Sequence, residues 1–245
     1  IVFGDWSSDV CSSDLAMTIS HHSPYDIPKD YANFPISLSN EVKQRIKTPE
    51  EVALRCFRAY QYANNCLGNF IEKVKKSQLG KNTIIVATGD HNLLQLFDFS
   101  DKDLLMKYSV PLIMYVPDSY KPKTSVNTKI FASHKDIFPT VFNTSLSEAS
   151  YLKTGNNLFS PEAKNNIGVH CYRIAMDSVG CVDYTTKNPL FFRWNETGNQ
   201  LEPSNENPDK HLQDLMLKSK AYVASMNLFI MNDLTNKTKK EVEKK

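Results

Sequence analysis

The sequence of 245 residues contains no apolar run that approaches the ~20 residues needed for a membrane-spanning helix. It also lacks a strong charge of either sign, because 29 basic and 27 acidic residues leave a net charge of +2. This balance gives no support to a nucleic-acid-binding surface. The only basic cluster is the tail, residues 236–245, where five lysines are accompanied by Glu241 and Glu243. We interpret the tail as a solvated helix end or frayed terminus.

The start of the sequence has neither an initiator methionine nor a signal peptide, since residues 1–15 lack a basic beginning and contain three aspartates. We therefore expect a fragment whose targeting and anchoring segments lie upstream. Residues 5–15 contain a near-duplication, Ser-Ser-Asp-Val and then Ser-Ser-Asp-Leu, without a helical or strand period. They resemble translated sequencing-adapter read-through, so we interpret residues 1–15 as non-native and exclude them from fold reasoning.

Four cysteines remain outside that segment. Cys56 and Cys66 fall in one predicted helix, about 15 Å apart along its axis at ~1.5 Å per residue, so they cannot form a disulfide while the helix is intact. Cys171 and Cys181 flank a stretch that contains Gly180. They can close a loop in an oxidising compartment or remain a pair of buried thiols.

The clearest local pattern predicts a long helix from residue 48 to Gly80. Thr48 as N-cap, Pro49 at the first helical position and Glu51 three residues after the cap form a helix start. Gly80 is typical of a residue just past a helix end. Apolar residues between them follow a three-four spacing and predict one apolar face: Val52, Cys56, Tyr60, Ala63, Leu67, Phe70 and Val74.

Two apolar segments predict the strands of a central sheet. Residues 83–88 are β-branched and apolar without alternation, which is typical of a strand buried on both faces of a parallel sheet. Residues 110–117 form a second such segment bounded by prolines, and residues 133–143 predict a short helix. The order of elements predicts an α/β/α sandwich with a mostly parallel central sheet, truncated at its N-terminus.

The C-terminal part differs in composition from the rest of the sequence and is rich in asparagine, glycine and proline. Residues 174–176 and 190–194 predict small strands, and residues 212–234 predict a helix that packs back on the body, so we expect a smaller α+β part here. The domain prediction is a non-native segment (1–15), a catalytic-type domain (16–160), a C-terminal subdomain of the same unit (161–235) and a charged tail (236–245).

Asp90 and His91 are the strongest candidates for a functional site, because they directly follow the predicted strand at 83–88. In open parallel sheets, active sites collect at the carboxyl ends of strands. Gly89 frees the backbone to turn, so the two side chains need not point to opposite sides. A carboxylate oxygen beside an imidazole nitrogen makes half of a metal site. The alternative is an ordinary turn in which Asp90 caps the next helix and His91 is exposed.

Two further segments contain candidate histidines. His21 and His22 lie in a proline- and serine-containing loop, where they can bind a metal, donate hydrogen bonds to a phosphate, or simply lie on the surface. His134 precedes Asp136 and Pro139, a pattern that favours a helix start over a site.

Five segments occur in a fixed order: residues 18–25 (Thr-Ile-Ser-His-His-Ser-Pro-Tyr), Tyr60 with 67–71, 82–91, 110–113 and 133–140. In this order and spacing they resemble the lipoteichoic-acid synthases and related phosphoglycerol transferases of the alkaline phosphatase/sulfatase superfamily. The resemblance covers about residues 16–160 and is specific at the level of the superfamily.

The resemblance implies roles for individual residues. It makes Asp90 and His91 ligands of a divalent metal ion, for which manganese, zinc and calcium all remain open. It makes His22 a contact for the phosphate or head group of the substrate. His21 stands where the family often has asparagine and is kept as a second substrate-binding candidate. His134 stands at a position that varies and is kept as a further candidate.

The resemblance also implies a covalent mechanism, in which a metal-activated nucleophile takes a group from a donor and passes it on. The family's nucleophile and remaining acidic metal ligand precede residue 16, so we expect the 245 residues alone to show no turnover. The predicted function is transfer of phosphoglycerol or phosphoethanolamine from a lipid to a cell-envelope acceptor, in the periplasm or at the cell exterior, with upstream helices as membrane anchor. The alternatives are a sulfatase or phosphodiesterase that uses water, and a non-catalytic protein that binds head groups.

Overall fold

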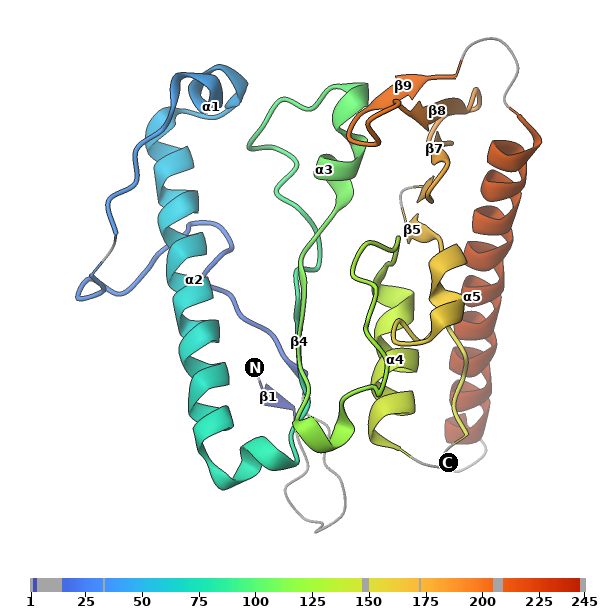
Figure 1. The fold of residues 1–245 in the computed structure, drawn as a ribbon, viewed down its shortest axis with the longest axis horizontal. Coiled ribbons are helices and arrows are strands. Elements are labelled where there is room, and N and C mark those ends of the chain that lie inside the picture. Colours follow the sequence, from blue (N-terminus) through green and yellow to red (C-terminus); the bar gives the residue numbers. More distant parts are fainter. Residues whose placement is uncertain are drawn as a thin grey trace. The chain divides into compact units, whose positions relative to one another are not determined.

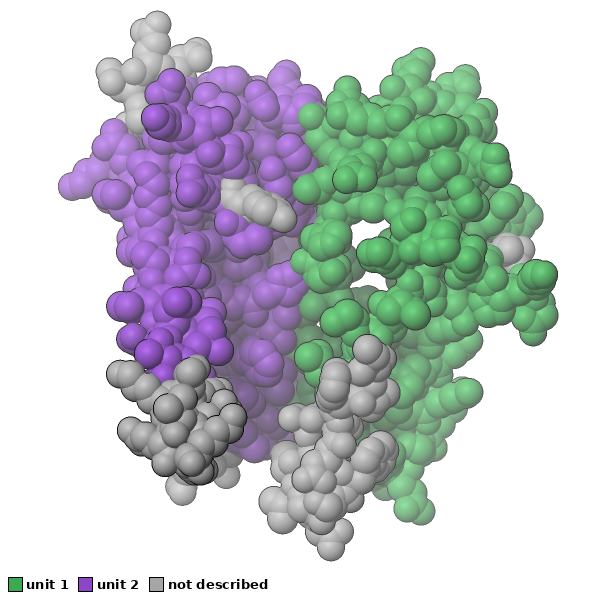
Figure 2. Space-filling view, turned by 180° about the vertical axis from the view of Figure 1, so that it is seen from behind, with its two compact units in different colours: residues 1–99, 110–115 green, residues 100–109, 116–245 purple. Residues whose placement is uncertain are grey.

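The computed structural model describes residues 2–3, 15–32, 34–146, 150–171, 173–204 and 209–242, and within these ranges the side chains of residues 15–236 are described. The chain has mixed helix and strand content, consistent with an α/β fold. It divides into two compact units (Figure 2). Unit 1 comprises Ile1–Phe99 and Val110–Tyr115, and unit 2 comprises Ser100–Ser109 and Val116–Lys245.

Unit 1 is built around the long helix α2, Glu50–Lys76, drawn in cyan in Figure 1. The helix begins one residue later than predicted, because Pro49 takes the N-cap position with an extended backbone and makes no side-chain cap. The expected capping box at Thr48 is therefore wrong. The Thr48 hydroxyl is buried without a hydrogen-bond partner among the described residues.

Only the first turns of α2 form a core. Ala53 and Cys56 pack with Leu96, which lies in the segment after strand β3. Tyr60 and Phe70, placed by the three-four spacing on the same apolar face, are about half exposed, at 49% and 55%. The prediction of the helix is confirmed, but its predicted end at Gly80 is wrong, because the helix ends at Lys76 with Ser77 as C-cap and Gly80 lies in the 3-10 turn that follows. The part of its apolar face beyond Cys56 is only partly covered.

Strands β3, Ile85–Thr88, and β4, Leu112–Tyr115, pair in an antiparallel ladder, with Ile85 opposite Tyr115 and Thr88 opposite Leu112. The mostly parallel central sheet is not seen in the described part of the chain. The parallel sheet was predicted from unbroken apolar runs. Such a run indicates a strand that is buried on both faces of its sheet, but it carries no information on the direction of the strand. In this structure both strands are half-buried or exposed.

Unit 2 contains a five-stranded antiparallel sheet in the order β5-β6-β7-β8-β9. Its strands are β5 (Gly168–His170), β6 (Ile174–Met176), β7 (Gly180–Asp183), β8 (Leu190–Trp194) and β9 (Leu201–Pro203). The strands predicted at 174–176 and 190–194 are confirmed. Helix α5, Lys210–Val242, contacts β6 and β7 and confirms the predicted C-terminal helix (Figure 1).

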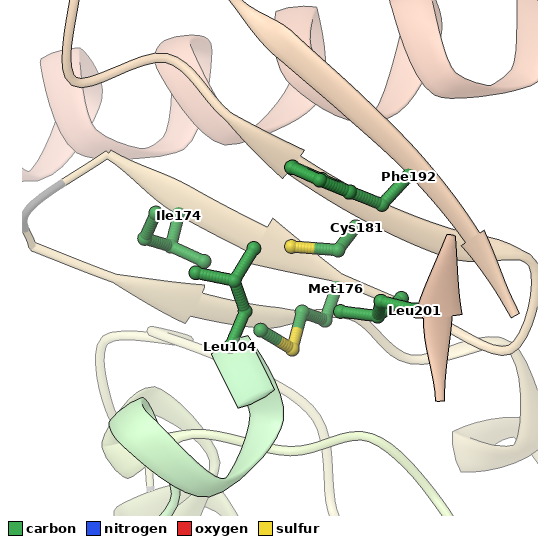
Figure 3. Close-up of a cluster of buried hydrophobic side chains, with 6 residues drawn as sticks. All are labelled: Leu104, Ile174, Met176, Cys181, Phe192 and Leu201. Atoms are coloured by element: carbon green, nitrogen blue, oxygen red, sulfur yellow. The ribbon is translucent and has the colours of Figure 1, made fainter. Parts of the chain in front are cut away.

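The sheet has two apolar faces, because successive residues of a strand point to opposite sides. Ala175 and Val182 pack with Leu212 and Leu215 of α5. On the other face Leu104, the first residue of α3 (Leu104–Tyr108), sits among sheet side chains (Figure 3). These are Ile174, Met176, Cys181, Phe192 and Leu201.

The remaining helices, strands and turns of the described chain are short. They are β1 (Val2–Phe3), β2 (Leu15–Ala16), α1 (Asn40–Arg45), α4 (Ile137–Ser145) and the 3-10 turns η1 (Gln78–Lys81), η2 (Asp101–Asp103), η3 (Asp118–Tyr120), η4 (His134–Asp136) and η5 (Pro161–Asn165). None of the described helices is long and apolar enough to cross a membrane.

The four cysteines of the described chain are free thiols. Of the two alternatives for Cys171 and Cys181, neither applies as stated: they form no disulfide, and only Cys181 is buried. Cys181 belongs to the sheet core, whereas Cys171 lies exposed after β5.

Candidate metal and phosphate site

Asp90 and His91 lie at the end of β3, where the strand stops at Thr88 and the chain turns through Gly89. Both side chains are open to solvent, with 87% of Asp90 and 65% of His91 exposed. The Asp90 carboxylate accepts a hydrogen bond of 2.8 Å from the His91 amide, and its other oxygen lies 3.5 Å from His91 Nε2. The pair therefore presents a carboxylate and an imidazole edge side by side.

The tautomer of His91 follows from its second nitrogen. His91 Nδ1 lies 3.0 Å from the backbone carbonyl oxygen of Asn92. Because a carbonyl can only accept, Nδ1 carries the proton and donates it. In the neutral form of the ring Nε2 then keeps the lone pair, and it is the nitrogen that lies beside Asp90. A histidine held in this way is prepared to bind a metal through Nε2.

The loop with His21 and His22 is organised by two backbone hydrogen bonds. His22 N donates to Ile19 O at 3.0 Å, and Tyr25 N donates to His22 O at 2.8 Å. His22 is exposed, and its Nδ1 lies 3.0 Å from Ser23 O, so its Nε2 also keeps the lone pair in the neutral form.

His21 is the loop histidine that interacts electrostatically with Asp90. Desolvation lowers the pKa of His21, and the charge of Asp90 acts in the opposite direction. The His21 ring also packs on the Tyr60 ring, with 5.1 Å between centroids and 51° between planes. The structure thus associates His21, Tyr60 and Asp90 within unit 1. Tyr60 was predicted as an apolar helix position and forms part of the family resemblance, but the sequence assigned it no role in the site, although its aromatic ring is a natural partner for an imidazole.

His134 stands in a different setting, in unit 2. It begins the 3-10 turn η4, in which Ser133 and Asp136 form a capping box, so the predicted helix start is confirmed. Asp136 is fully buried and accepts hydrogen bonds from Lys135 Nζ (2.7 and 2.8 Å), Asn166 Nδ2 (3.0 Å) and the amides of Ser133 (3.0 Å) and Asn156 (2.8 Å).

This segment has the properties of a structural core. Burial lowers the pKa of the Lys135 ammonium, while Asp136 raises it through charge and a hydrogen bond. A buried ion pair whose remaining polar atoms are satisfied holds local structure in place. The role of His134 itself stays a prediction.

The Asp90–His91 pair fits a divalent metal ion by the chemistry of its donors. Imidazole nitrogen suits zinc and other borderline metals, and carboxylate oxygen suits manganese and magnesium. No group of three or more histidine, cysteine or acidic residues that could hold a metal occurs within the described ranges. The pair supplies two ligands, so a complete site needs further donors.

A family model described as Sulfatase matches residues 15–145, which is more than half of the chain. The matched range includes the loop with His21 and His22, helix α2, strands β3 and β4 and the Asp90–His91 pair. A search of curated proteins gives no match. Members of this family generally use divalent metal ions, and the donors at the end of β3 agree with that chemistry. The chain belongs to the sulfatase family, within the alkaline phosphatase superfamily of hydrolases and transferases.

Proposed function

We propose that this protein is a metal-dependent transferase that moves a phosphoglycerol or phosphoethanolamine group from a lipid donor to a cell-envelope acceptor through a covalent intermediate. The observation that carries the proposal is the exposed Asp90–His91 pair, in which the imidazole Nε2 lies 3.5 Å from a carboxylate oxygen. We place the reaction outside the cytoplasm, at the membrane surface.

The residues of this chain have separable roles in that reaction. Asp90 and His91 hold the metal ion, which when bound neutralises negative charge on the transferred phosphoryl group. His22 and His21 contact the phosphate oxygens or the head group. In its protonated form an imidazole donates from both nitrogens, so either histidine can pair with an anionic oxygen. Tyr60 fixes the His21 ring through their 5.1 Å contact. The nucleophile is not assigned to a residue of this chain.

A sulfatase or phosphodiesterase of the same superfamily, which uses water as the acceptor, is the second candidate. It is favoured by the family match itself, since the matched model is that of sulfatases. The two candidates share the metal pair and the covalent step, and they differ in the ester that is cleaved and in the acceptor. The products therefore distinguish them.

The test uses the protein expressed from its natural gene, with Mn²⁺ or Zn²⁺, and two kinds of substrate. We expect diacylglycerol to be released from phosphatidylglycerol or phosphatidylethanolamine as the head group passes to an added hydroxyl acceptor, and the donor that reacts identifies the head group. Release of diacylglycerol together with free phosphoglycerol or phosphoethanolamine would indicate a phosphodiesterase. Hydrolysis of p-nitrophenyl sulfate without release of diacylglycerol would establish the sulfatase instead.

The matched variant is Asp90→Asn, which keeps the size of the side chain and removes the anionic ligand. We expect it to lower Mn²⁺ affinity at least tenfold and kcat/KM on the order of 100-fold, because a metal ligand and its charge are lost together. Asp98→Asn is the control in the same unit, since Asp98 is exposed and forms a surface ion pair with Lys47. Unchanged metal affinity and turnover in Asp90→Asn would refute the assignment. Metal-independent lipid binding without turnover would favour the head-group-binding alternative.

A further inference from the structure

Unit 2 contains a polar pocket that none of the preceding functions uses. Its volume is about 230 Å³. The polar side chains that line it include Asn143, Tyr151, Asn156, Asn157, Ser160 and Glu162. Ligand pockets for drug-sized molecules span roughly 300–1,000 Å³, so this one is suited to a smaller unit.

The wall formed by Asn156 is held in place by the buried core behind it. Its backbone amide donates to Asp136 Oδ1 at 2.8 Å, and its side-chain Nδ2 donates to Asn166 Oδ1 at 3.0 Å. Asn157 is fixed by the backbone, because its Oδ1 accepts a hydrogen bond of 3.0 Å from the amide of Phe159. A pocket whose side chains are already ordered loses less entropy when a ligand binds.

These hydrogen bonds within the pocket determine which donors and acceptors remain available to a ligand. Asn143 uses Nδ2 to donate to Pro139 O and to the Tyr151 oxygen, which leaves Asn143 Oδ1 as an acceptor and the Tyr151 hydroxyl as a donor. Asn156 Oδ1 likewise remains available as an acceptor, and the NH₂ group of Asn157 remains available as a donor. Ser160 Oγ accepts from the Glu162 amide at 3.3 Å, so its hydroxyl proton is available.

Charge further restricts the ligand. The pocket includes one cation, Lys153, and one carboxylate, Glu162. Both are exposed, and no described residue forms a hydrogen bond or ion pair with either side chain. An anion such as phosphate accepts hydrogen bonds and would meet the Glu162 carboxylate. A ligand with several hydroxyl groups can both donate and accept at adjacent positions, as this mixture of donors and acceptors requires.

We propose that this pocket binds a neutral polyol, either a sugar residue or a glycerol unit. Hydroxyl groups of the ligand donate to Glu162 and to the Oδ1 atoms of Asn143 and Asn156. They accept from Asn157 Nδ2 and from the hydroxyls of Tyr151 and Ser160. The proposal stands on the chemistry of unit 2 alone and does not depend on the metal pair.

The probes are glucose and glycerol, added separately to the ¹⁵N-labelled 245-residue chain and followed by the side-chain amide resonances of its asparagines. We expect saturable shifts of the Asn156 and Asn157 amides with a Kd of about 1–10 mM, the range expected for a few hydrogen bonds to a small ligand. A response to glucose alone assigns the site to sugars, and a response to glycerol alone assigns it to glycerol units.

Two variants test the assigned contacts without disturbing the wall. Glu162→Gln removes the charged acceptor and is expected to raise Kd at least fivefold. Asn157→Asp keeps the Oδ1 that holds Phe159, removes the NH₂ donor, and is expected to weaken binding by a similar factor. Glu196→Gln, on an exposed loop of the same unit that does not line the pocket, is the control and should leave Kd unchanged.

Three results would overturn the proposal. They are the absence of saturable shifts with either polyol, stronger binding of inorganic phosphate than of both polyols, and a Glu162→Gln variant that binds like the unaltered chain. Thermal unfolding of each variant confirms that unit 2 remains folded, so that lost binding is not a consequence of lost structure.

Discussion

Cys171 and Cys181 lie close in the sequence but in different environments, which makes them a sensitive test of the structure at the scale of single residues. Cys171 is exposed, and Cys181 is fully buried between neighbouring strands. Desolvation raises the pKa of the Cys181 thiol, and the nearby carboxylates of Asp183 and Asp177 raise it further. Because the thiolate is the reactive species, Cys181 should be inert in the folded chain.

We predict that Cys171→Ser removes one fast-reacting thiol from the native chain, whereas Cys181→Ser removes none. The measurement is the burst of a coloured thiol reagent before and after unfolding in guanidinium. After unfolding, each variant should show one thiol fewer than the parent chain. If Cys171 failed to react in the native chain under reducing pretreatment, its exposed position would be wrong.

Asp90 and His91 show how far a sequence can define a site at this scale. The order of strand, glycine, acid and histidine predicted adjacent donors, and the structure places them 3.5 Å apart. The contribution of His21 could not be derived in the same way. Its link to Asp90 and its contact with Tyr60 depend on how a loop lies beside a distant helix and strand, which local patterns do not encode.

At the scale of secondary-structure elements, the close pairing of β7 and β8 depends on one glycine. Gly180 is buried and lies opposite Arg193. A Cβ atom at this position would lie only 2.0 Å from the Phe192 carbonyl oxygen, a backbone atom that cannot rotate away. Any side chain at residue 180 must therefore push the two strands apart.

Gly180→Ala is accordingly expected to lower the free energy of unfolding by about 1–3 kcal/mol or more, because overpacking forces backbone shifts. Gly68→Ala is the matched control inside α2 where, apart from the helix's own backbone, no described atom lies within 4 Å of an added methyl group. That change should stabilise the chain by about 0.5–1 kcal/mol, because alanine favours a helix. Urea unfolding of both variants measures the two effects, and equal changes in the same direction would contradict the explanation.

The sequence predicted the positions of helices and strands more reliably than it predicted how the strands pair. The periodicity of residues 52–74 and the helical spacing of residues 212–234 were enough to predict α2 and α5. Strand direction could not be predicted in this way, because β3 and β4 carry the same apolar residues whichever way they run, and the ladder that they form is antiparallel. The five-stranded sheet of unit 2 was predicted only as separate small strands. Each strand pairs with the next along the chain, but strands of three to five residues are too short for their alternation to define a sheet.

At the scale of the whole molecule, the two units have their own cores and their own candidate sites. In unit 1, Ala53, Cys56 and Leu96 form a core, and the same unit contains the Asp90–His91 pair. In unit 2 the sheet has apolar clusters on both faces, and the polyol pocket lies beside the buried Asp136 network. This division suggests that stability and metal binding can be separated by mutation.

Asp136→Ala tests that separation. The change leaves the Lys135 ammonium, whose side chain is 7% exposed, without its buried counter-ion, and it removes the acceptor for the amides of Ser133 and Asn156. Breaking a buried pair in this way costs about 3–5 kcal/mol, so unit 2 should open locally or unfold. Asp118→Ala is the control, because the Asp118–Lys121 pair is exposed and should contribute little to stability.

Hydrogen exchange resolved along the chain, combined with Mn²⁺ titration, distinguishes the outcomes of Asp136→Ala. We expect amide protection in β5–β9 to fall while protection in α2 and the Mn²⁺ affinity of the Asp90–His91 pair stay the same. A parallel loss of Mn²⁺ binding would mean that the fold of unit 1 depends on unit 2. The metal pair would then have to be regarded as a property of the whole chain, because the turn that holds Asp90 beside His91 would not persist without the second core.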